Sequence, residues 1–386
     1  MKQADEILSV NNIFKVFGPN PDLAMQMLRK GADKHEIFSK TGHVVGVFDA
    51  SFAVKRGEIF VIMGLSGSGK STMVRLFNRL IEPTSGRIHL NGREITGLSD
   101  KELLDVRRKE MGMVFQSFAL MPHMSVLQNT AFGLEIAGVA EQERTRRARE
   151  ALSQVGLAGH EHSYPHQLSG GMQQRVGLAR ALANDPTILL MDEAFSALDP
   201  LIRSEMQGEL IRLQAEQQRT IIFISHDIEE AIRIGHRIAI MEGGKVVQIG
   251  TPQELINQPA NDYVRTFFKG FDSSRVLKAG DVAEFDPELV CRVNGKAPRF
   301  RAGVPFGYLV DECGQLLGVV DTAADGAAAT DRYSLHERQP VYTDTPLHEV
   351  LDIAATLPYP VPVLDREGAL KGTLSKNQLL QTLSRH

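Results

Sequence analysis

The sequence predicts an α/β fold followed by a second, smaller domain of α+β character. Short apolar strands alternate with amphipathic helical stretches from about residue 44 to residue 250. A glycine-rich loop directly follows one of these strands, and an internal repeat appears after residue 276. Alternating strands and helices favour a largely parallel sheet that is covered by helices on both faces. The length of 386 residues agrees with two or three domains of roughly 150 residues each.

The predicted strands of the larger domain are short and almost continuously apolar, which is typical of strands buried on both faces. Their ranges are 58–63 (EIFVIM), 187–191 (TILLM) and 220–225 (TIIFIS). Residues 237–241 and 245–249 flank the turn Glu242-Gly243-Gly244 and predict a hairpin. Residues 100–185 are mostly helical in pattern, including a charged stretch over 141–150, and predict a helical subdomain.

Composition and charge predict a globular protein that is cytosolic or peripheral to a membrane. The net charge of −4 gives no overall attraction to nucleic acid or to an anionic membrane. The first ten residues, MKQADEILSV, contain acidic residues and lack the apolar core of a secretion signal. Apolar runs such as IFVIM are far shorter than the ~20 residues of a membrane-spanning helix. Cys291 and Cys313 lack CxxC spacing and are predicted to be reduced structural thiols.

A phosphate-binding loop is predicted at residues 64–72, which read GLSGSGKST and directly follow a strand. The glycines allow a tight turn that aims backbone N–H groups inward, and Lys70 offers a positive charge to the β- and γ-phosphates. The hydroxyl of Ser71 is suited to Mg²⁺, and the helix beginning near Lys70 presents its positive end to the phosphates. A plain glycine-rich connecting turn is the alternative, which the strand–loop–helix context disfavours. The predicted nucleotide-binding residues of this loop are Gly64, Leu65, Ser66, Gly67, Ser68, Gly69, Lys70, Ser71 and Thr72.

A second motif, ILLMDE over residues 188–193, is an apolar strand that ends in two carboxylates. Asp192 at the strand end is predicted to hold the Mg²⁺ shell, and Glu193 to polarise an attacking water. A pair of acids capping a helix is the alternative for either residue alone. The presence of the phosphate loop in the same chain favours the catalytic interpretation.

Residues 168–175 read LSGGMQQR, in which Ser169 and two glycines open a helix whose N-terminus can bind an anion. Together with the two motifs above, this segment resembles the signature of the ATP-binding-cassette (ABC) ATPases. The resemblance covers residues from about 7 to 270 and implies the P-loop NTPase fold, with ATP and Mg²⁺ as cofactors. It also implies a homodimer with two equivalent hydrolytic sites. In such a dimer Ser169, Gly170, Gly171 and Gln173 of one subunit face the ATP that the other subunit holds.

Further positions match the ABC family and take their implied roles from it. Gln116, in MVFQSFALMP, matches the Q-loop glutamine, which ligates Mg²⁺ and links the site to a membrane subunit. Asp199, in SALD, matches the D-loop that crosses the dimer interface, and His226, in FISHD, matches the histidine that contacts the γ-phosphate. Phe17, in KVFG, matches the aromatic residue that stacks on adenine. Structural roles are the alternatives for His226 and for Phe17, the latter through core packing.

A narrower resemblance comes from an insert at residues 19–43, where apolar spacing indicates short helices. With FQSFALMPHMSVLQNTAFG and SHDIEEAIRIGHRIAIM, it resembles the glycine betaine/proline-type quaternary amine ATPases. This subfamily implies import of an osmoprotectant such as glycine betaine, choline, carnitine or proline betaine. It further implies a peripheral protein on the cytoplasmic face of the bacterial inner membrane. Its partners would be integral permease subunits and, through them, a substrate-binding protein.

The internal repeat pairs LVDECGQLLGVV (309–320) with VLDREGALKGTL (363–374) and resembles two CBS motifs. We therefore expect an ATPase domain over 1–270 and a CBS-like regulatory pair over 276–386, with the first copy degenerate. A helix is predicted over 346–357. Gln378 stands where adenosine-binding CBS motifs carry an acid, which argues against nucleotide binding by this pair. Sensing of ionic strength or of a ligand is the hypothesis for its role.

Two other functions are alternatives to osmoprotectant import. An amino-acid or methionine importer subunit would share the cassette, but the insert and the CBS-like pair count against it. A nucleic-acid-associated ABC protein could use an arginine cluster at 144–149, where interleaved glutamates favour a solvated helix face instead. We therefore expect no nucleic-acid partner.

Overall fold

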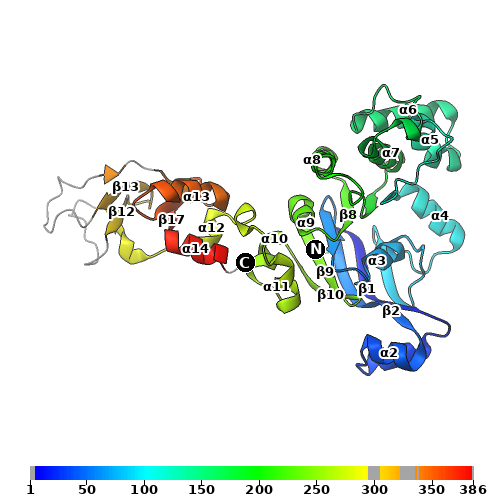
Figure 1. Ribbon diagram of the computed structural model, residues 1–386, viewed down its shortest axis with the longest axis horizontal. Coiled ribbons are helices and arrows are strands. Elements are labelled where there is room, and N and C mark those ends of the chain that lie inside the picture. The colour runs from blue at the N-terminus through cyan, green and yellow to red at the C-terminus, as the bar shows by residue number, and fades with distance from the viewer. Residues whose placement is uncertain (1–4, 294–304, 322–334, 337–338, 385–386) are drawn as a thin grey trace. The chain divides into compact units, whose positions relative to one another are not determined.

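The computed structural model describes residues 5–293, 305–321, 335–336 and 339–384. The chain divides into two compact units, Met1–Phe267 and Phe268–His386. Figure 1 draws both units and labels helices and strands in each where there is room. In the described parts of the chain, no helix is both long and apolar enough to cross a membrane.

The centre of the first unit is a six-stranded sheet in the order β10-β9-β3-β8-β7-β6. Its strands are β3 (Ile59–Met63), β6 (Met111–Phe115), β7 (Ile188–Asp192), β8 (Thr220–Ser225), β9 (Arg237–Glu242) and β10 (Lys245–Gly250). All neighbours pair in parallel except β9 and β10, which form an antiparallel hairpin. Every residue of β3 and β8 is buried, as expected for strands covered on both faces. The predicted parallel sheet and hairpin are confirmed.

An antiparallel sheet in the order β2-β1-β4-β5 accompanies the central sheet. Its strands are β1 (Glu6–Phe17), β2 (Val44–Lys55), β4 (Ser85–Leu90) and β5 (Arg93–Glu94). The main hydrophobic core joins both sheets to α3 (Lys70–Phe77). Within it the ring of Phe52 stacks on Phe60 at 5.4 Å between centroids and meets Phe77 edge-on at 6.1 Å. The helix that starts at Lys70 is therefore anchored by the same core that holds β3.

The insert between β1 and β2 forms two short helices, α1 (Asp22–Arg29) and α2 (Lys34–Thr41), as the apolar spacing predicted. The two helices pack on β1 and β2 through a small cluster of their own. Its buried members are Val16, Ala24, Met25, Leu28, Ile37 and Val45. The insert thus rests on the two strand ends that carry Phe17 and Val44.

The predicted helical region over 100–185 holds α4 (Asp100–Lys109), α5 (Val126–Ile136), α6 (Glu141–Gln154) and α7 (Gly170–Leu182). Figure 1 shows α5, α6 and α7 grouped together, apart from β8 and β9. The prediction missed β6, which interrupts this region and completes the central sheet beside β7. Five residues, MGMVF, are too short for the sequence pattern alone to separate a strand from the neighbouring helices.

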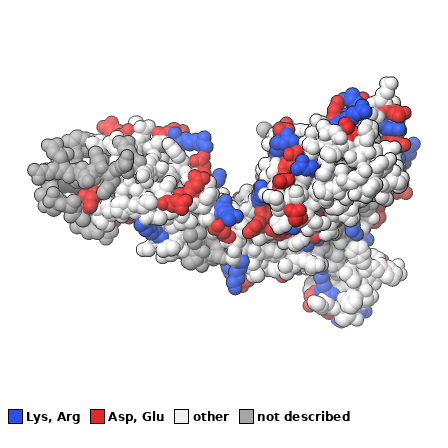
Figure 2. All heavy atoms as spheres, turned by 45° about the horizontal axis from the view of Figure 1, so that its top comes forward, with Lys and Arg blue, Asp and Glu red and all other residues white. Residues whose placement is uncertain are grey.

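The arginine-rich stretch at 141–150 forms a solvated helix face, as its interleaved glutamates predicted. Arg146 contacts Glu143 at 2.7 Å and Glu150 at 2.6 Å, and Arg147 also contacts Glu143 at 2.6 Å. Figure 2 shows basic and acidic residues intermixed on the visible face of the molecule. These arginines are engaged by carboxylates of their own helix.

Four further helices complete the first unit, and the chain then enters the second. They are α8 (Pro200–Gln217), α9 (Ile228–Ile234), α10 (Pro252–Asn257) and α11 (Asp262–Phe268). In the second unit the strands are β11 (Val290–Arg292), β12 (Phe306–Val310), β13 (Leu316–Asp321), β14 (Leu335–His336), β15 (Val341–Tyr342), β16 (Val361–Leu364) and β17 (Leu370–Leu374). Its helices are α12 (Ala279–Val282), α13 (Leu347–Thr356) and α14 (Lys376–Ser384). The helix predicted over 346–357 is confirmed as α13.

The internal repeat corresponds to two antiparallel hairpins, β12–β13 and β16–β17, in the second unit. Their turns pair with each other: Leu316 N donates to Gly368 O at 3.2 Å, and Leu370 N to Gly314 O at 3.0 Å. The alanine-rich stretch after Asp321 and most of the segment just upstream of Phe306 lie outside the described residues. Both cysteines are free thiols, as predicted, but Cys313 is exposed and Cys291 only partly buried, so neither is packed as a buried structural thiol.

The Gln378 side chain is used within its own helix. Its Oε1 accepts a hydrogen bond from Ser375 N at 2.7 Å, while Gln378 N donates to Ser375 Oγ at 3.2 Å. This reciprocal pair satisfies two backbone donors at the start of α14. Gln378 therefore serves here as part of a helix cap.

The shared core predicts that Phe60→Ala destabilises the first unit by about 3–5 kcal/mol, because it leaves a cavity between the two sheets. Phe60 is fully buried, whereas Phe38 on α2 is 58% exposed and supplies a matched control. Phe38→Ala should change the free energy of unfolding by no more than about 0.5 kcal/mol. Denaturant unfolding followed by circular dichroism would compare the two variants, and equal losses would contradict this description of the core.

Candidate functional site

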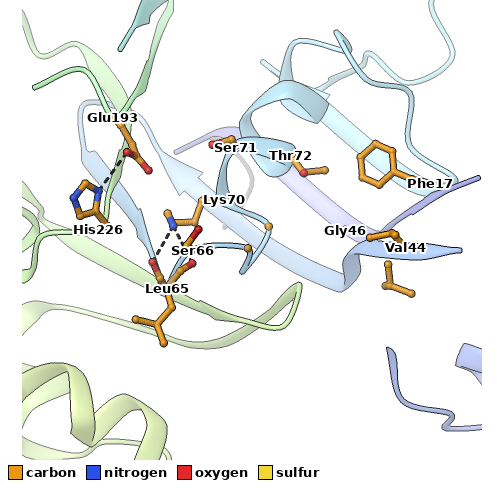
Figure 3. Close-up of a pocket in the computed structure, with 14 residues that line it drawn as sticks. Phe17, Val44, Gly46, Leu65, Ser66, Lys70, Ser71, Thr72, Glu193 and His226 are labelled. Carbon is orange, nitrogen blue, oxygen red and sulfur yellow. Dashed lines mark hydrogen bonds and ion pairs between the residues drawn. The ribbon is translucent and has the colours of Figure 1, made fainter. Parts of the chain in front are cut away.

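The predicted phosphate loop links the end of β3 to the start of α3. Gly64, Gly67 and Gly69 all have positive φ, at 157°, 76° and 104°, which glycine adopts without steric cost. The Lys70 ammonium is buried and donates to Gly64 O at 2.8 Å and to Leu65 O at 3.1 Å (Figure 3). Burial lowers the pKa of Lys70, and the nearby carboxylates of Glu193 and Asp192 partly oppose that shift. The phosphate loop therefore surrounds the positively charged Lys70 side chain with its own backbone carbonyls.

Two segments distant in sequence, the β9–β10 turn and β2, contact the phosphate loop. Gly244, in the β9–β10 turn, donates its N–H to Ser68 O at 2.8 Å and accepts from Phe48 N at 2.8 Å. A Cβ at Gly69 would lie 2.4 Å from Gly46 O, and a Cβ at Gly244 would lie 2.8 Å from the same oxygen. Three backbone segments therefore meet where a side chain would not fit. Sequence reasoning did not identify Gly46 or Gly244 as parts of the site.

Tyr263 on α11 is another residue that sequence reasoning missed. Its hydroxyl donates to Met241 O at 3.1 Å and lies 3.5 Å from Leu65 N. Burial raises the pKa of the Tyr263 hydroxyl. The tyrosine thus braces the first turn of the phosphate loop against the end of β9.

A cavity of about 670 Å³ opens along the phosphate loop. Its lining comprises Phe17, Val44, Val45, Gly46, Gly64, Leu65, Ser66, Gly67, Gly69, Lys70, Ser71, Thr72, Glu193 and His226. Figure 3 shows Phe17, Val44 and Gly46 at one end, Glu193 and His226 at the other, and Lys70 and Ser71 between them. The Phe17 ring is 38% exposed, so core packing, the alternative considered for it, does not describe its position. The cavity is apolar at one end and charged at the other.

The charged end is formed by residues that follow neighbouring parallel strands. Glu193 comes directly after β7 and has a positive φ of 48°, and His226 comes directly after β8. His226 Nδ1 lies 3.3 Å from Glu193 Oε2. Since β7 and β8 are neighbours, their carboxyl ends bring these two side chains to one edge of the sheet. Glu193 and His226, which are predicted separately from the sequence, therefore lie side by side.

Asp192 and Ser71 form a second contact beside the phosphate loop. Ser71 Oγ donates to Asp192 Oδ1 at 3.1 Å. Burial raises the pKa of the Asp192 carboxyl, and the hydrogen bond from Ser71 and the positive charge of Arg75 oppose the shift. Two hard oxygen donors at this spacing fit a Mg²⁺ ion that takes its other ligands from phosphate and water.

The loop also contains an unpaired polar atom. Ser68 Oγ is buried and has no hydrogen-bond partner among the described residues. A buried hydroxyl without a partner costs free energy. Ser68 is the one predicted residue of the phosphate loop that does not line the cavity, so the buried charge of Lys70 is the feature of the loop that fits a polyphosphate group.

Other predicted site residues lie outside the cavity lining. Gln116 Nε2 donates to Ser196 Oγ at 3.0 Å, and Ser196 Oγ in turn donates to Glu193 O at 2.9 Å. Asp199 caps α8 by accepting from Ile202 N at 3.1 Å. Ser196, between β7 and α8, thus connects the Gln116 side chain to the backbone carbonyl of Glu193.

The predicted signature residues form the N-terminus of α7. Ser169 Oγ accepts from Met172 N at 3.3 Å, and Gln173 Nε2 donates to Leu168 O at 3.2 Å. A Cβ at Gly171 would lie 2.4 Å from Ile202 Cγ2, so α7 and α8 pack too closely there for a side chain. Neither Ser169 nor Gly170, Gly171 or Gln173 lines the cavity of its own chain.

Glu230 on α9 is a buried acid that sequence reasoning missed. Its carboxylate accepts hydrogen bonds from Ser225 Oγ at 2.5 Å and from Gln207 Nε2 at 3.1 Å. Burial raises the pKa of Glu230, and these two hydrogen bonds partly oppose the shift. Because Ser225 directly precedes His226, Glu230 helps to hold the end of β8 that carries the histidine.

The strand–loop–helix phosphate site, with two carboxylates at the end of β7 and a histidine at the end of β8, defines a P-loop nucleoside triphosphatase. Residues 47–196 match the family model described as "ABC transporter". The chain covers 99% of a solved structure titled "Dimeric Structure of MJ0796, a Bacterial ABC Transporter Cassette", at 32% identity and a TM-score of 0.54 over 64% of its own length. The fold is that of an ABC ATPase.

Two curated relatives extend this similarity over almost the whole chain. One is the glycine betaine/proline betaine transport system ATP-binding protein ProV of Salmonella typhimurium, 55% identical over 98% of both chains. Another is the glycine betaine transport ATP-binding protein OpuAA of Bacillus subtilis, 50% identical over 98% of this chain and 92% of the relative. The chain therefore belongs to the glycine betaine/proline betaine family of ABC transporter ATP-binding proteins.

The buried Glu230 predicts a pH-dependent difference in stability. Because folding raises its pKa, the charged form destabilises the folded state at about pH 7, and this cost is lost below the unfolded pKa of about 4.3. Glu230→Gln keeps the size of the side chain and removes the charge. We expect the melting temperature of Glu230→Gln to exceed that of wild type at about pH 7, and this difference to shrink towards about pH 4.

The neighbouring Glu229 is exposed and provides the control. Melting temperatures of Glu229→Gln should stay close to those of wild type at both pH values. If the difference in melting temperature between Glu230→Gln and wild type were the same at both pH values, burial would not raise the pKa of Glu230.

Proposed function

We propose that this chain binds ATP with Mg²⁺ and hydrolyses it to power import of a quaternary amine osmoprotectant, such as glycine betaine, choline, carnitine or proline betaine. One observation carries the nucleotide part: a single cavity joins the exposed ring of Phe17 to Lys70 and then to the Glu193–His226 pair. The substrate class is supported by the similarity to ProV, which spans both units of the chain.

The cavity suggests how the nucleotide would lie. Phe17 would stack on the adenine, and residues 64–72 would wrap the phosphates, with Lys70 leaving its backbone carbonyls for the β- and γ-phosphates. Ser71, Asp192 and Gln116 would hold Mg²⁺, which offsets the negative charge that gathers on the phosphates during transfer.

Hydrolysis requires a water aligned with the γ-phosphate. Glu193 lies at the end of the cavity beyond Lys70 and would polarise this water. His226, 3.3 Å from Glu193, would contact the γ-phosphate and hold the glutamate in place. The hydrogen bonds from Gln116 through Ser196 to the Glu193 carbonyl connect this end of the cavity to the Q-loop.

A homodimer would complete the two sites. Ser169, Gly170, Gly171 and Gln173 do not line the cavity of their own chain, and the capped N-terminus of α7 is suited to an anion. In the dimer these residues would face the γ-phosphate held by the other subunit, and Asp199 would lie at the interface. The dimeric solved cassette of similar fold supports this arrangement.

The transport pathway would come from other proteins. We propose that the chain is peripheral to the cytoplasmic face of the inner membrane, bound to integral permease subunits that receive solute from a substrate-binding protein. The second unit would act as a CBS-like regulatory pair. The carboxylate contacts of Arg146 and Arg147 support the view that nucleic acid is not a partner.

An amino-acid or methionine importer is the second candidate, because it would share the cassette. It is disfavoured by the extent of the similarity to ProV, which includes the insert helices and the second unit as well as the cassette. Uptake measurements distinguish the two.

The role of Glu193 predicts that Glu193→Gln lowers ATP turnover by ~10²–10⁴-fold while ATP binding is kept, because the amide cannot accept a proton from water. ATP should then trap a closed dimer, visible as a doubled mass in light scattering. Glu216→Gln, on the exposed end of α8, is the control and should hydrolyse ATP normally. Near-normal hydrolysis by Glu193→Gln would remove this residue from the role of base.

The transport part is tested in cells that lack this gene. Uptake of labelled glycine betaine, choline, carnitine and proline would be measured before and after osmotic upshift, with wild type or Glu193→Gln supplied. Restoration of quaternary amine uptake by wild type alone is expected. Equal uptake with both genes for every solute would contradict the proposed substrate class.

A further inference from the structure

The segment that follows Gln116 has an unusual backbone. Phe118 and Ala119 both have positive φ, at 56° and 49°. For residues with a Cβ this conformation is strained and persists only where the surroundings enforce it. Residues 117–124, called here the strap, are therefore held in place by contacts outside themselves.

Arg180, near the end of α7, provides the principal contact. Its guanidinium donates to Phe118 O at 2.9 Å and to Ala119 O at 2.5 Å, the carbonyls of the two left-handed residues. The guanidinium is partly withdrawn from water, and this burial lowers the pKa of Arg180. Hydrogen bonds from a charged donor in such surroundings are stronger than neutral ones.

The strap also follows α7 towards its N-terminus. A Cβ at Gly177 would lie 3.6 Å from Phe118 O, and a Cβ at Gly170 would lie 3.8 Å from Phe118 Cζ. Phe118 therefore lies along α7 from its first turn to Arg180, about three turns further on. The strap therefore contacts α7 near both ends of that helix.

The far end of the strap is attached to α5. Asn129 is fully buried, and its Nδ2 donates to Met121 O at 3.1 Å and to Met124 O at 3.0 Å. Its Oδ1 accepts from Met121 N at 2.7 Å. The strap is thus tied to α7 at Phe118–Ala119 and to α5 at Met121–Met124, and it directly follows Gln116.

We propose that Arg180 is a positioning residue that makes the strap move together with α7. When the N-terminus of α7, which carries the signature residues, closes on ATP, its movement is then transmitted to the residues after Gln116. The proposal rests on the proposed function, in which Ser169 and its neighbours meet ATP across a dimer. Arg180 itself does not line the cavity. It acts by joining the helix to the strap.

The chain offers a matched control for loss of such an arginine. Arg107 on α4 donates to Asn78 O at 2.7 Å and to Arg79 O at 2.7 Å, again two successive carbonyls. Arg79 also has a positive φ, at 51°. Arg107→Lys therefore removes the same kind of contact at a place away from α7 and the strap.

Amide hydrogen exchange of the full chain tests the proposal. All variants carry Glu193→Gln, so that bound ATP and Mg²⁺ are kept. In this parent, ATP should change exchange both at residues 168–174 and in the strap. With Arg180→Lys the change at 168–174 should persist, and the change in the strap should shrink by about 2- to 30-fold, the range over which single residues alter coupling. Arg107→Lys should leave both responses intact.

An unchanged strap response in Arg180→Lys would overturn the proposal, as would a parent that responds at 168–174 and not in the strap. A parent with no response at 168–174 would overturn the proposed dimer, and this proposal with it. If Arg180→Lys does not fold, as judged by exchange in β3 and β8, Arg180→Gln removes the partly buried charge and is measured in its place with the same expectation.

Discussion

The nucleotide site depends on one close approach of three backbone segments. The carbonyl of Gly46 in β2 lies against Gly69 of the phosphate loop and Gly244 of the β9–β10 turn, at distances that leave no room for a Cβ. The hydrogen bond from Gly244 N to Ser68 O closes this junction. Because β2 belongs to the antiparallel sheet and β9–β10 to the central sheet, the junction sets the position of both sheets around the loop.

The rest of the site follows from that junction and from strand order. With β2 held against the phosphate loop, Phe17 and Val44 reach one end of the cavity, and the insert helices pack behind them. The adjacency of β7 and β8 brings Glu193 and His226 to the other end. A single chain thereby forms an apolar end, a cationic centre and an end with Glu193 and His226. The N-terminus of α7 does not line this cavity and would meet the ATP of a second subunit in the proposed dimer.

Local signals in the sequence predicted much of this. The phosphate loop, the carboxylates after β7, the histidine after β8 and the β9–β10 hairpin all carry short motifs whose meaning does not depend on distant residues. What escaped prediction is non-local. The strand β6 is defined by pairing with β7, and Gly46 and Gly244 by contacts with the phosphate loop. Glu230 is defined by its burial and its hydrogen bond from Ser225 at the end of β8. The carbonyls of the left-handed residues Phe118 and Ala119 accept hydrogen bonds from Arg180, which lies about 60 residues away in the chain and carries no local sign of that contact.

The most direct test of this account compares ATP binding by Gly244→Ala and Gly243→Ala. Both glycines have positive φ, so both variants carry the same kind of backbone strain, but a Cβ at Gly244 alone would meet Gly46 O, at 2.8 Å. With both variants shown to be folded by circular dichroism, calorimetry should give Gly244→Ala an affinity for ATP at least about tenfold weaker than that of Gly243→Ala, a difference of about 1.4 kcal/mol. Equal affinities would show that the nucleotide site does not depend on this junction.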